Sequence, residues 1–336
     1  HLSIRRQRQM CIRDRFNEMT HERLTFAKQI GVVGVQMNTP QFPDETGYWR
    51  VEDLVRTREK AESYGLKLEA LENVPLKWID KIHLGLPGRD ELIENYQRTI
   101  RNMGEAGIPV LGYGWMPNWV WRTPMELGRG GVRVTAFDMA KIDSAPLVAG
   151  LRTVEALEGR TISHDEMWAN YTYFMQAVIP VAEEAGVTLA LHPDDPPVPE
   201  LGGIARLFHD PAGFRRAVEE IAPSPNHGLD FCMGCFSEMG LDVIEQIEYF
   251  ASRGKITYVH FRDVQGCVPN FKESFLGEGN VDVVAAMCAL KRSGFTGFII
   301  DDHVPKMTDD SDWNHRGHAH QTGYILALVE AVQKLC

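Results

Sequence analysis

The feature that most constrains the fold is an alternation of short apolar segments with longer amphipathic segments along most of the chain. The apolar segments are bounded by Gly, Pro or polar residues, and several amphipathic segments end in Gly directly before the next apolar one. Near-continuous apolar strands between helices are typical of a parallel sheet that is buried on both faces. The expected strands span 31–38, 66–74, 109–117, 187–195, 227–234, 256–264 and 295–303.

Strands at this spacing in a chain of 336 residues predict an α/β protein with a (β/α)8 barrel (TIM barrel), which needs one strand more than these seven. A helix-like segment over 19–31 precedes the first expected strand, so the missing strand belongs upstream of it. Residues 1–15 carry five arginines and one aspartate, unlike the rest of the chain. We therefore expect 1–15 to be a non-native or disordered leader, with the first strand missing or replaced. The alternative is a basic arm for anionic partners, which the absence of interleaved aromatic residues disfavours.

The rest of the chain, 16–336, is expected to form a single catalytic barrel domain. Two segments exceed ordinary loop lengths, 118–150 and 303–322, and the second is rich in His and Asp. In a barrel, excursions of this kind cover the active face.

Composition excludes several classes of function. Lys and Arg number 35 against 46 Asp and Glu, a net charge of −11, whereas a binder of duplex nucleic acid normally has a basic face. No apolar run approaches the ~18 residues of a membrane span, so no membrane partner is expected. Six cysteines in a chain of this length do not make a disulfide framework, and we expect them reduced, in the cytoplasm. The sequence is compatible with a homo-oligomer and does not decide between this and a monomer.

Four successive expected strands end in a side chain that can bind a metal: His192, Cys232, His260 and Asp302. They lie 40, 28 and 42 residues apart, but the C-terminal ends of barrel strands ring one face, so they should converge there. Two imidazoles, a thiolate and a carboxylate suit a divalent transition metal such as Zn²⁺, Fe²⁺ or Mn²⁺, and the thiolate disfavours Mg²⁺ and Ca²⁺. Each residue alone has a structural explanation; four equivalent positions together favour a metal site.

Further candidates surround this set. Asp194 and Asp195 follow His192 and would either orient its ring or cap the next helix. Arg262 shares a strand face with His260 and could hold a substrate carboxylate, the alternative being an ion pair. His303 is a natural general acid or base beside a metal, and Tyr324 is expected to open the last helix near the same face.

Two other patterns are weaker. Cys232 and Cys235 form a CxxC, but no second CxxC accompanies it and the pair does not follow the first strand of a thioredoxin-like unit. The cluster of His315, His318 and His320 could be a second metal tract, although histidines in loops are more often unligated.

Longer stretches carry a resemblance to a known family. They include WANYTYFMQAVIPVAEEAGVTLALHPDDPP, GLDFCMG, VHFRDV, the GEGNVD run that ends at residue 282, and DDH. Together with further stretches from about residue 30 onward, the chain resembles mannonate dehydratase, a member of the xylose-isomerase-like barrel proteins. Two segments depart from the family pattern: 1–15 has no counterpart of its opening strand, and DDHVPKMTDDSDWN differs from its shorter form.

The resemblance implies removal of water from D-mannonate to give 2-keto-3-deoxy-D-gluconate in hexuronate breakdown, with Mn²⁺ or Fe²⁺ as cofactor. It implies that His192, Cys232, His260 and Asp302 bind the metal and that His303 and Tyr324 are catalytic. Two groups are expected because one proton leaves C2 and another must reach the departing C3 oxygen. Arg262 would hold the carboxylate of this small sugar-acid substrate.

Three alternatives remain at this point. A sugar isomerase or epimerase could use the same metal on the same barrel to move a proton without releasing water. A DNA-repair phosphodiesterase barrel would need more metal ligands and a basic surface, which the charge of −11 disfavours. A catalytically silent binder of metal or sugar acid is expected if loss of the first strand leaves the barrel open.

Overall fold

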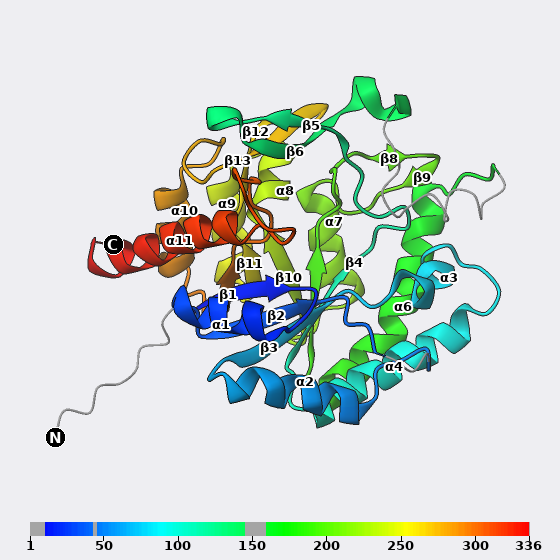
Figure 1. Ribbon diagram of the computed structural model, residues 1–336. Coiled ribbons are helices and arrows are strands. Elements are labelled where there is room, and N and C mark those ends of the chain that lie inside the picture. The colour runs from blue at the N-terminus through cyan, green and yellow to red at the C-terminus, as the bar shows by residue number, and fades with distance from the viewer. Residues whose placement is uncertain (1–10, 43–45, 145–158, 336) are drawn as a thin grey trace.

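The computed structural model describes residues 11–42, 46–144 and 159–335, and its centre is a closed barrel of eight parallel strands (Figure 1). The strands follow one another around the barrel in the order β1-β14-β11-β10-β7-β4-β3-β2. Their bounds are β1 (Cys11–Phe16), β2 (Gly34–Asn38), β3 (Lys67–Glu72), β4 (Val110–Gly114), β7 (Thr188–His192), β10 (His227–Cys232), β11 (Ile256–His260) and β14 (Phe298–Ile300). The predicted TIM barrel is confirmed, and each of the seven expected strands contains one of these.

The prediction of a missing or replaced first strand is wrong. β1 lies inside the segment expected to be a leader and pairs in parallel with β2, where Arg13 is opposite Gly34, and with β14, where Ile12 is opposite Ile299. It therefore closes the barrel and leaves no open edge between the first and last strands. Residues 1–10 of the expected leader lie outside the described residues.

Of the two arginines of β1, Arg13 is buried and Arg15 is partly buried, and carboxylates of other parts of the barrel neutralise both. Arg13 lies 2.5 Å from Glu69 of β3, and Gly34 leaves room for its side chain, since a Cβ there would lie 2.6 Å from Arg13 Cδ. Asp14, between the two arginines, faces the other side of the strand, as strand alternation requires, and lies near His318 of the last helix. A charged strand is thus compatible with the core only through partners distant in sequence.

Helices surround the barrel, and Figure 1 shows α2, α4 and α6 along its outer side. Their ends follow local rules: Ser163 and Glu166 form a capping box at the start of α6, and Gly186 ends it with a left-handed φ of 66°. Asp242 and Asp282 are the N-caps of α9 and α10, and each side chain accepts hydrogen bonds from two backbone N–H groups of the first turn. The helices are α1 (His21–Gln29), α2 (Val51–Ser63), α3 (Asp80–His83), α4 (Arg89–Glu105), α6 (His164–Ala185), α7 (Pro211–Arg215), α8 (Met233–Glu238), α9 (Val243–Ser252), α10 (Val283–Arg292) and α11 (His315–Leu335).

The first expected excursion, 118–150, contains a β-hairpin, and its last residues from 145 lie outside the described part of the chain. The hairpin joins a second hairpin that follows β11, which gives an antiparallel sheet in the order β12-β13-β6-β5. Figure 1 shows this sheet across one end of the barrel. Its strands are β5 (Thr123–Leu127), β6 (Arg133–Asp138), β12 (Asp263–Cys267) and β13 (Asn270–Ser274), and a separate small hairpin pairs β8 (Glu200–Leu201) with β9 (Ile204–Ala205). The second excursion, 303–322, is a loop only as far as 314, because α11 begins at His315.

The main core lies between the barrel strands and the helices, and a smaller apolar cluster fills the barrel interior. In the interior, Tyr258 and Phe298 stack with their ring centroids 4.8 Å apart. Among the described residues, no helix combines the length and apolar character needed to cross a membrane. The expectation that all cysteines are reduced is wrong for Cys288, which is in a disulfide, whereas Cys232, Cys235 and Cys267 are free.

Candidate active site

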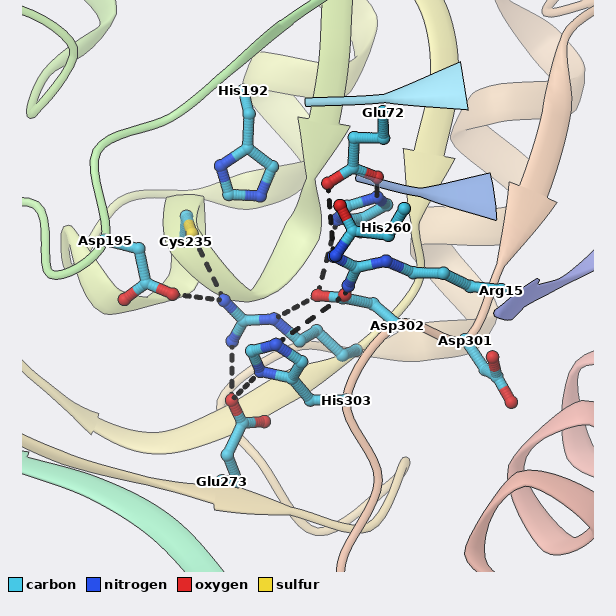
Figure 2. Close-up of polar contacts among 12 residues, drawn as sticks. Arg15, Glu72, His192, Asp195, Cys235, His260, Glu273, Asp301, Asp302 and His303 are labelled. Atoms are coloured by element: carbon cyan, nitrogen blue, oxygen red, sulfur yellow. Dashed lines mark hydrogen bonds and ion pairs between the residues drawn. The ribbon is translucent and has the colours of Figure 1, made fainter. Parts of the chain in front are cut away.

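The four predicted metal-binding side chains converge at the C-terminal ends of β7, β10, β11 and β14. The ligand atoms of Cys232, His260 and Asp302 all lie within 4.8 Å of one another, and so do those of His192, Asp230 and His260. The His192 and His260 rings lie 5.2 Å apart between centroids. Figure 2 shows His192, His260 and Asp302 around the same region. The geometric expectation from strand positions is therefore met.

The backbone aims the last of these groups. Asp301 and Asp302 are consecutive, but Asp302 has a left-handed φ of 56°, which is uncommon for a residue with a side chain. Asp302 consequently turns into the cluster, with its Oδ2 3.3 Å from His260 Nδ1. Asp301 points away from it (Figure 2) and is 2.9 Å from His318 Nδ1.

The donor atoms fit a divalent cation. Both ring nitrogens of His260 and both carboxylate oxygens of Asp230 are buried, and none makes a hydrogen bond of good geometry with the described residues, although His260 Nε2 is only 3.2 Å from Asp230 Oδ2. His192 Nδ1 lies 2.7 Å from the carbonyl oxygen of Pro193, so it can donate there and leave Nε2 free as a ligand. Buried polar atoms rarely lack partners, and a cation would supply one.

Electrostatics determines which acidic groups here are ionised. Burial opposes ionisation of Glu72, but the adjacent Arg15 guanidinium outweighs it and lowers the pKa of Glu72 to about 2. Burial also opposes ionisation of Asp302, yet His260 and His303 hold its pKa well below the usual range. Two ionised carboxylates therefore face the imidazoles.

The pKa values of the Cys232 thiol and the His192 imidazole are shifted by their charged neighbours in directions that favour metal binding. Burial would raise the pKa of Cys232, but a hydrogen bond from Cys235 and the charge of Arg262 hold it well below its usual range. Burial would lower the pKa of His192, but the Asp230 carboxylate raises it to about 9. Anionic neighbours thus stabilise positive charge on the ring, and a divalent cation can take the place of such protons.

A cavity of about 230 Å³, which we call the cluster cavity, opens beside these groups. Asn38 and Asn73 offer amides to it, and Met116 and Trp119 give it apolar contact. A cavity that combines apolar surface with a few polar groups, next to perturbed titratable groups, is the expected setting of a small-molecule site. The described residues that line it are Arg15, Asn38, Glu72, Asn73, Met116, Trp119, Val120, His192, Asp195, His260, Asp302 and His303.

The predicted role of Arg262 as a substrate-binding residue is not supported. Arg262 is buried, and its guanidinium is occupied by protein groups: Nη1 is 2.8 Å from Glu238 and 3.0 Å from Glu273, and Nε is 3.0 Å from Asp302 Oδ2. It does not line the cluster cavity. Its Nη2 lies 3.3 Å from Asp195 Oδ2 and 3.2 Å from Cys235 Sγ, so its five donors face five protein acceptors and none is left for a substrate carboxylate.

Neither alternative offered for the two aspartates after His192 is correct. Asp194 is fully buried, lies 3.1 Å from Arg206 Nε and accepts a hydrogen bond of 2.6 Å from the Phe208 backbone. Asp195 binds Arg122 with both carboxylate oxygens and lies 3.3 Å from Arg262. The Asp194 and Asp195 side chains therefore hold arginines in place, whereas His192 is oriented by a backbone carbonyl.

His303 lies at the cavity and Tyr324 does not. His303 Nδ1 is 3.2 Å from Glu273 Oε1, and its side chain is 36% exposed, which leaves the ring accessible from the cavity. Tyr324 is the tenth residue of α11, about 14 Å along the helix from its start at a rise of 1.5 Å per residue. Its hydroxyl lies beside Gly277, 2.9 Å from where a Cβ would be, and Tyr324 is not among the described residues that line the cavity beside the cluster. The expectation that Tyr324 opens the helix was wrong.

The histidine tract on α11 does not gather at one point. His315 contacts Ser311 Oγ at 2.8 Å, and His320 packs against the ring of Phe275. His318 instead lies with Asp14 and Asp301, so each of the three histidines has a different set of neighbours. Cys235 lies within 4.8 Å of Cys232 and His192, and it also receives a hydrogen bond from Arg262, so the CxxC belongs to the cluster surroundings.

Comparison with known proteins adds the family. Residues 10–336 match the model of the D-mannonate dehydratase (UxuA) family. The chain belongs to the D-mannonate dehydratase family. Mannonate dehydratase 2 of Halalkalibacterium halodurans is 34% identical over 302 residues, which cover 84% of this chain and 85% of that protein. The mannonate dehydratase of Thermotoga petrophila is 30% identical and matches 91% of each chain.

Structural comparison agrees. The crystal structure of mannonate dehydratase from Streptococcus suis serotype 2 has a TM-score of 0.86 at 28% identity and covers 97% of this chain and 95% of its own. A structure of L-ribulose 3-epimerase has a TM-score of 0.59 at 16% identity, which shows the shared barrel fold alone. As a member of the D-mannonate dehydratase family, the chain is an enzyme of the hydro-lyase class.

The cluster of this family member also contains residues that sequence reasoning missed. Asp230 lies two residues before Cys232 in the same strand, so alternation alone could have placed it on the same face. Glu72 is the last residue of β3, at the same level of the barrel as the other strand ends. Arg15 was assigned to a leader, and no local signal marks it as a barrel residue.

Proposed function

We propose that this enzyme removes water from D-mannonate to give 2-keto-3-deoxy-D-gluconate, with one Mn²⁺ or Fe²⁺ held by His192, Cys232, His260 and Asp302. The observation that carries the proposal is the convergence of these side chains beside the cluster cavity in a chain of the D-mannonate dehydratase family. A mixed nitrogen, sulfur and oxygen donor set favours a transition metal over Mg²⁺ or Ca²⁺. The metal, when bound, supplies Lewis acidity to the carboxylate and C2 hydroxyl of the acid.

The protein groups account for the remaining tasks. Elimination requires that a proton leave C2 and that the departing C3 oxygen receive one, and His303 is the accessible titratable side chain that we assign to proton transfer. Its contact with Glu273 Oε1 fixes the orientation of the ring. The amides of Asn38 and Asn73 can hydrogen-bond to sugar hydroxyls from the cavity wall.

Arg15 takes part of the role first given to Arg262. Its guanidinium lines the cluster cavity and forms ion pairs with Asp302 and, at 3.2 Å, with Glu72. It keeps both carboxylates ionised and in place at the position where the substrate carboxylate would bind. The proposal also assigns the enzyme to hexuronate breakdown in the cytoplasm, where the free thiol of Cys232 would stay reduced.

A direct assay tests the function. The protein is purified anaerobically, its metal is identified, and samples reloaded with Mn²⁺ or Fe²⁺ are incubated with D-mannonate and with other hexonates. We expect a 2-keto-3-deoxy acid whose mass is lower than that of the substrate by one water. The variant Cys232→Ser, treated in the same way, should lose metal and turnover together.

The same assay distinguishes dehydration from the alternative activity, isomerisation or epimerisation. An isomerase or epimerase on this barrel would give a product of unchanged mass, because no water is released. Formation of such an isomer, or metal binding with no turnover of any hexonate, would overturn the proposal.

A further inference from the structure

A second cavity adjoins the cluster cavity and has no role in the mechanism above. It has a volume of about 290 Å³ and shares Arg15, Asn38, Asp302 and His303 with the cluster cavity. We call it the Arg23 cavity, after the cation that lines it beyond the shared wall. The two cavities therefore lie side by side at His303 and the other shared residues.

Arg23, near the start of α1, is an unusual arginine in this part of the molecule. It is half-buried and lines the cavity, yet its guanidinium forms no ion pair with any carboxylate of the described residues. Its contacts are a weak hydrogen bond of 3.4 Å from Nη1 to the Glu18 carbonyl and a position 5.7 Å from the centroid of the Trp313 ring. By contrast, Arg13 and Arg15 are matched by carboxylates.

Trp313 gives this cation a fixed platform. Its ring packs edge-on against Phe16, 6.1 Å away, and against Phe26, 4.9 Å away. The ring therefore holds the guanidinium through a cation–π contact, and the Glu18 carbonyl is the acceptor that the described residues give its donors. Because Arg carries several donors in a planar fork, an unpaired guanidinium in a cavity is suited to a carboxylate or a phosphate.

The charge balance of the lining points the same way. The lining contains Arg15, Arg23 and His318 but a single carboxylate, Asp302. That carboxylate is already occupied by Arg15 and by Arg262. Arg15 is matched by Glu72 and Asp302, and His318 lies 2.9 Å from Asp301. Arg23 is therefore the cation of this lining that no carboxylate of the described residues matches, in a chain whose net charge is −11. This unmatched guanidinium attracts an anion to the end of the cavity remote from the cluster.

We propose that the Arg23 cavity binds a second anionic group at the far end of the sugar-acid chain, so that the preferred substrates are hexonates with a carboxylate or a phosphate at C6. This inference rests on the proposed dehydration, because it assumes that the first carboxylate is held at the cluster. Arg23 is then a specificity-determining residue: it binds the group at C6, and the reacting carbons stay beside His303.

The experiment compares three acids that differ at C6: D-mannonate, D-mannarate and 6-phospho-D-mannonate. Each is tested with the wild type and with Arg23→Gln, Arg23→Lys and Lys28→Gln, all loaded with the same metal. Lys28→Gln is the matched control, because it removes a positive charge from the other end of α1, where Lys28 Nζ contacts the Gly65 carbonyl. The measured quantity is kcat/KM for loss of water, together with the Kd of each acid from calorimetry.

We expect the wild type to prefer at least one of the two dianionic acids to D-mannonate by tenfold or more. Arg23→Gln should lower that preference by about 10- to 100-fold, as is typical when a hydrogen bond to a charged group is lost, and should do so mainly through KM. Arg23→Lys should retain part of the preference, and Lys28→Gln should retain all of it. The separate carboxylate and phosphate arms show which anion fits.

The outcomes separate this inference from the proposed function. If D-mannonate is dehydrated but neither dianionic acid is preferred, or if Arg23→Gln weakens all three acids equally, the inference is wrong and the function stands. If no acid is dehydrated, the function fails, and the calorimetric ratio still decides whether Arg23 selects a second anion.

Discussion

Arg15 and Asp302 lie 287 residues apart in the sequence and form an ion pair where the first and last barrel strands end. The same guanidinium lies 3.2 Å from Glu72 at the end of β3 (Figure 2). A single side chain thus links the closure of the barrel to a candidate metal ligand.

Replacement of Arg15 should therefore damage both stability and the site. Arg15→Gln leaves the buried Glu72 without its arginine and leaves Asp302 with Arg262 alone, and we expect the free energy of unfolding to fall by about 3–5 kcal/mol. Urea unfolding at pH 7 measures it, with Arg316→Gln, an exposed change, as the control. The double variant Arg15→Gln/Glu72→Gln should lose less than the sum of the two single changes, because the second change removes one stranded charge. An unchanged unfolding free energy in Arg15→Gln would contradict this account.

The sequence predicted the barrel and the four-ligand set because both follow from local patterns: apolar strands between helices, and polar residues at strand ends. β1 escaped the same reasoning because its sequence, CIRDRF, is charged. Its arginines fit the core through Glu69, Glu72 and Asp302, and pairing between distant residues has no local signature. The predictions for Arg262 and Tyr324 failed for a similar reason. Which acceptors occupy the Arg262 guanidinium and where α11 begins both depend on tertiary structure.

Cys232→Ser should weaken metal binding more than it weakens the fold. A hydroxyl is a poorer ligand than the thiolate that the surroundings of Cys232 favour, and we expect at least a tenfold loss of affinity for Fe²⁺ or Mn²⁺. Metal content after dialysis against a chelator gives the answer. Cys267→Ser, at an exposed free thiol, serves as the control and should retain its metal. Equal metal content in both variants would remove Cys232 from the ligand set.

His303→Asn should separate chemistry from metal binding. The side chain contacts Glu273 and is not needed to complete the four-ligand set, so metal content should stay at the wild-type level. Turnover should fall by about 10²- to 10⁴-fold, the usual contribution of a general acid or base. His320→Asn, at an exposed position on α11 that packs against Phe275, should keep full activity. Full activity in His303→Asn would show that His303 does not transfer a proton in the reaction.

Arg262 provides a test between substrate binding and positioning. If it held the substrate, Arg262→Lys would mainly raise KM. The structure instead gives its guanidinium to Glu238, Glu273 and Asp302, so we expect a lower melting temperature and lower metal affinity, with KM for the remaining active enzyme nearly unchanged. Thermal unfolding with and without added metal, together with steady-state kinetics, distinguishes the two. A raised KM at wild-type stability would restore the substrate-binding interpretation.

Two buried histidines away from the cluster should make stability depend on pH. Burial lowers the pKa of His83 to about 3 and that of His227 to about 4. His83 has no hydrogen-bond partner among the described residues and lies edge-on to Trp115, 4.4 Å away, whereas His227 contacts the Tyr113 hydroxyl at 2.9 Å. Both rings are therefore neutral in the native protein at pH values where the unfolded chain binds a proton.

The sign follows from the number of bound protons. Below a pH of about 6.5 the unfolded histidine is protonated and the native one is not, so stability is complete above that pH and is lost as the pH falls toward 4. Each histidine should account for about 2 kcal/mol of the loss at pH 5. His83→Leu, which removes the titrating ring, should therefore lose about 2 kcal/mol less than the wild type between pH 7 and pH 5 in urea unfolding. His21→Leu, at an exposed position, should follow the wild type, and an equal loss in all three proteins would show that His83 does not contribute.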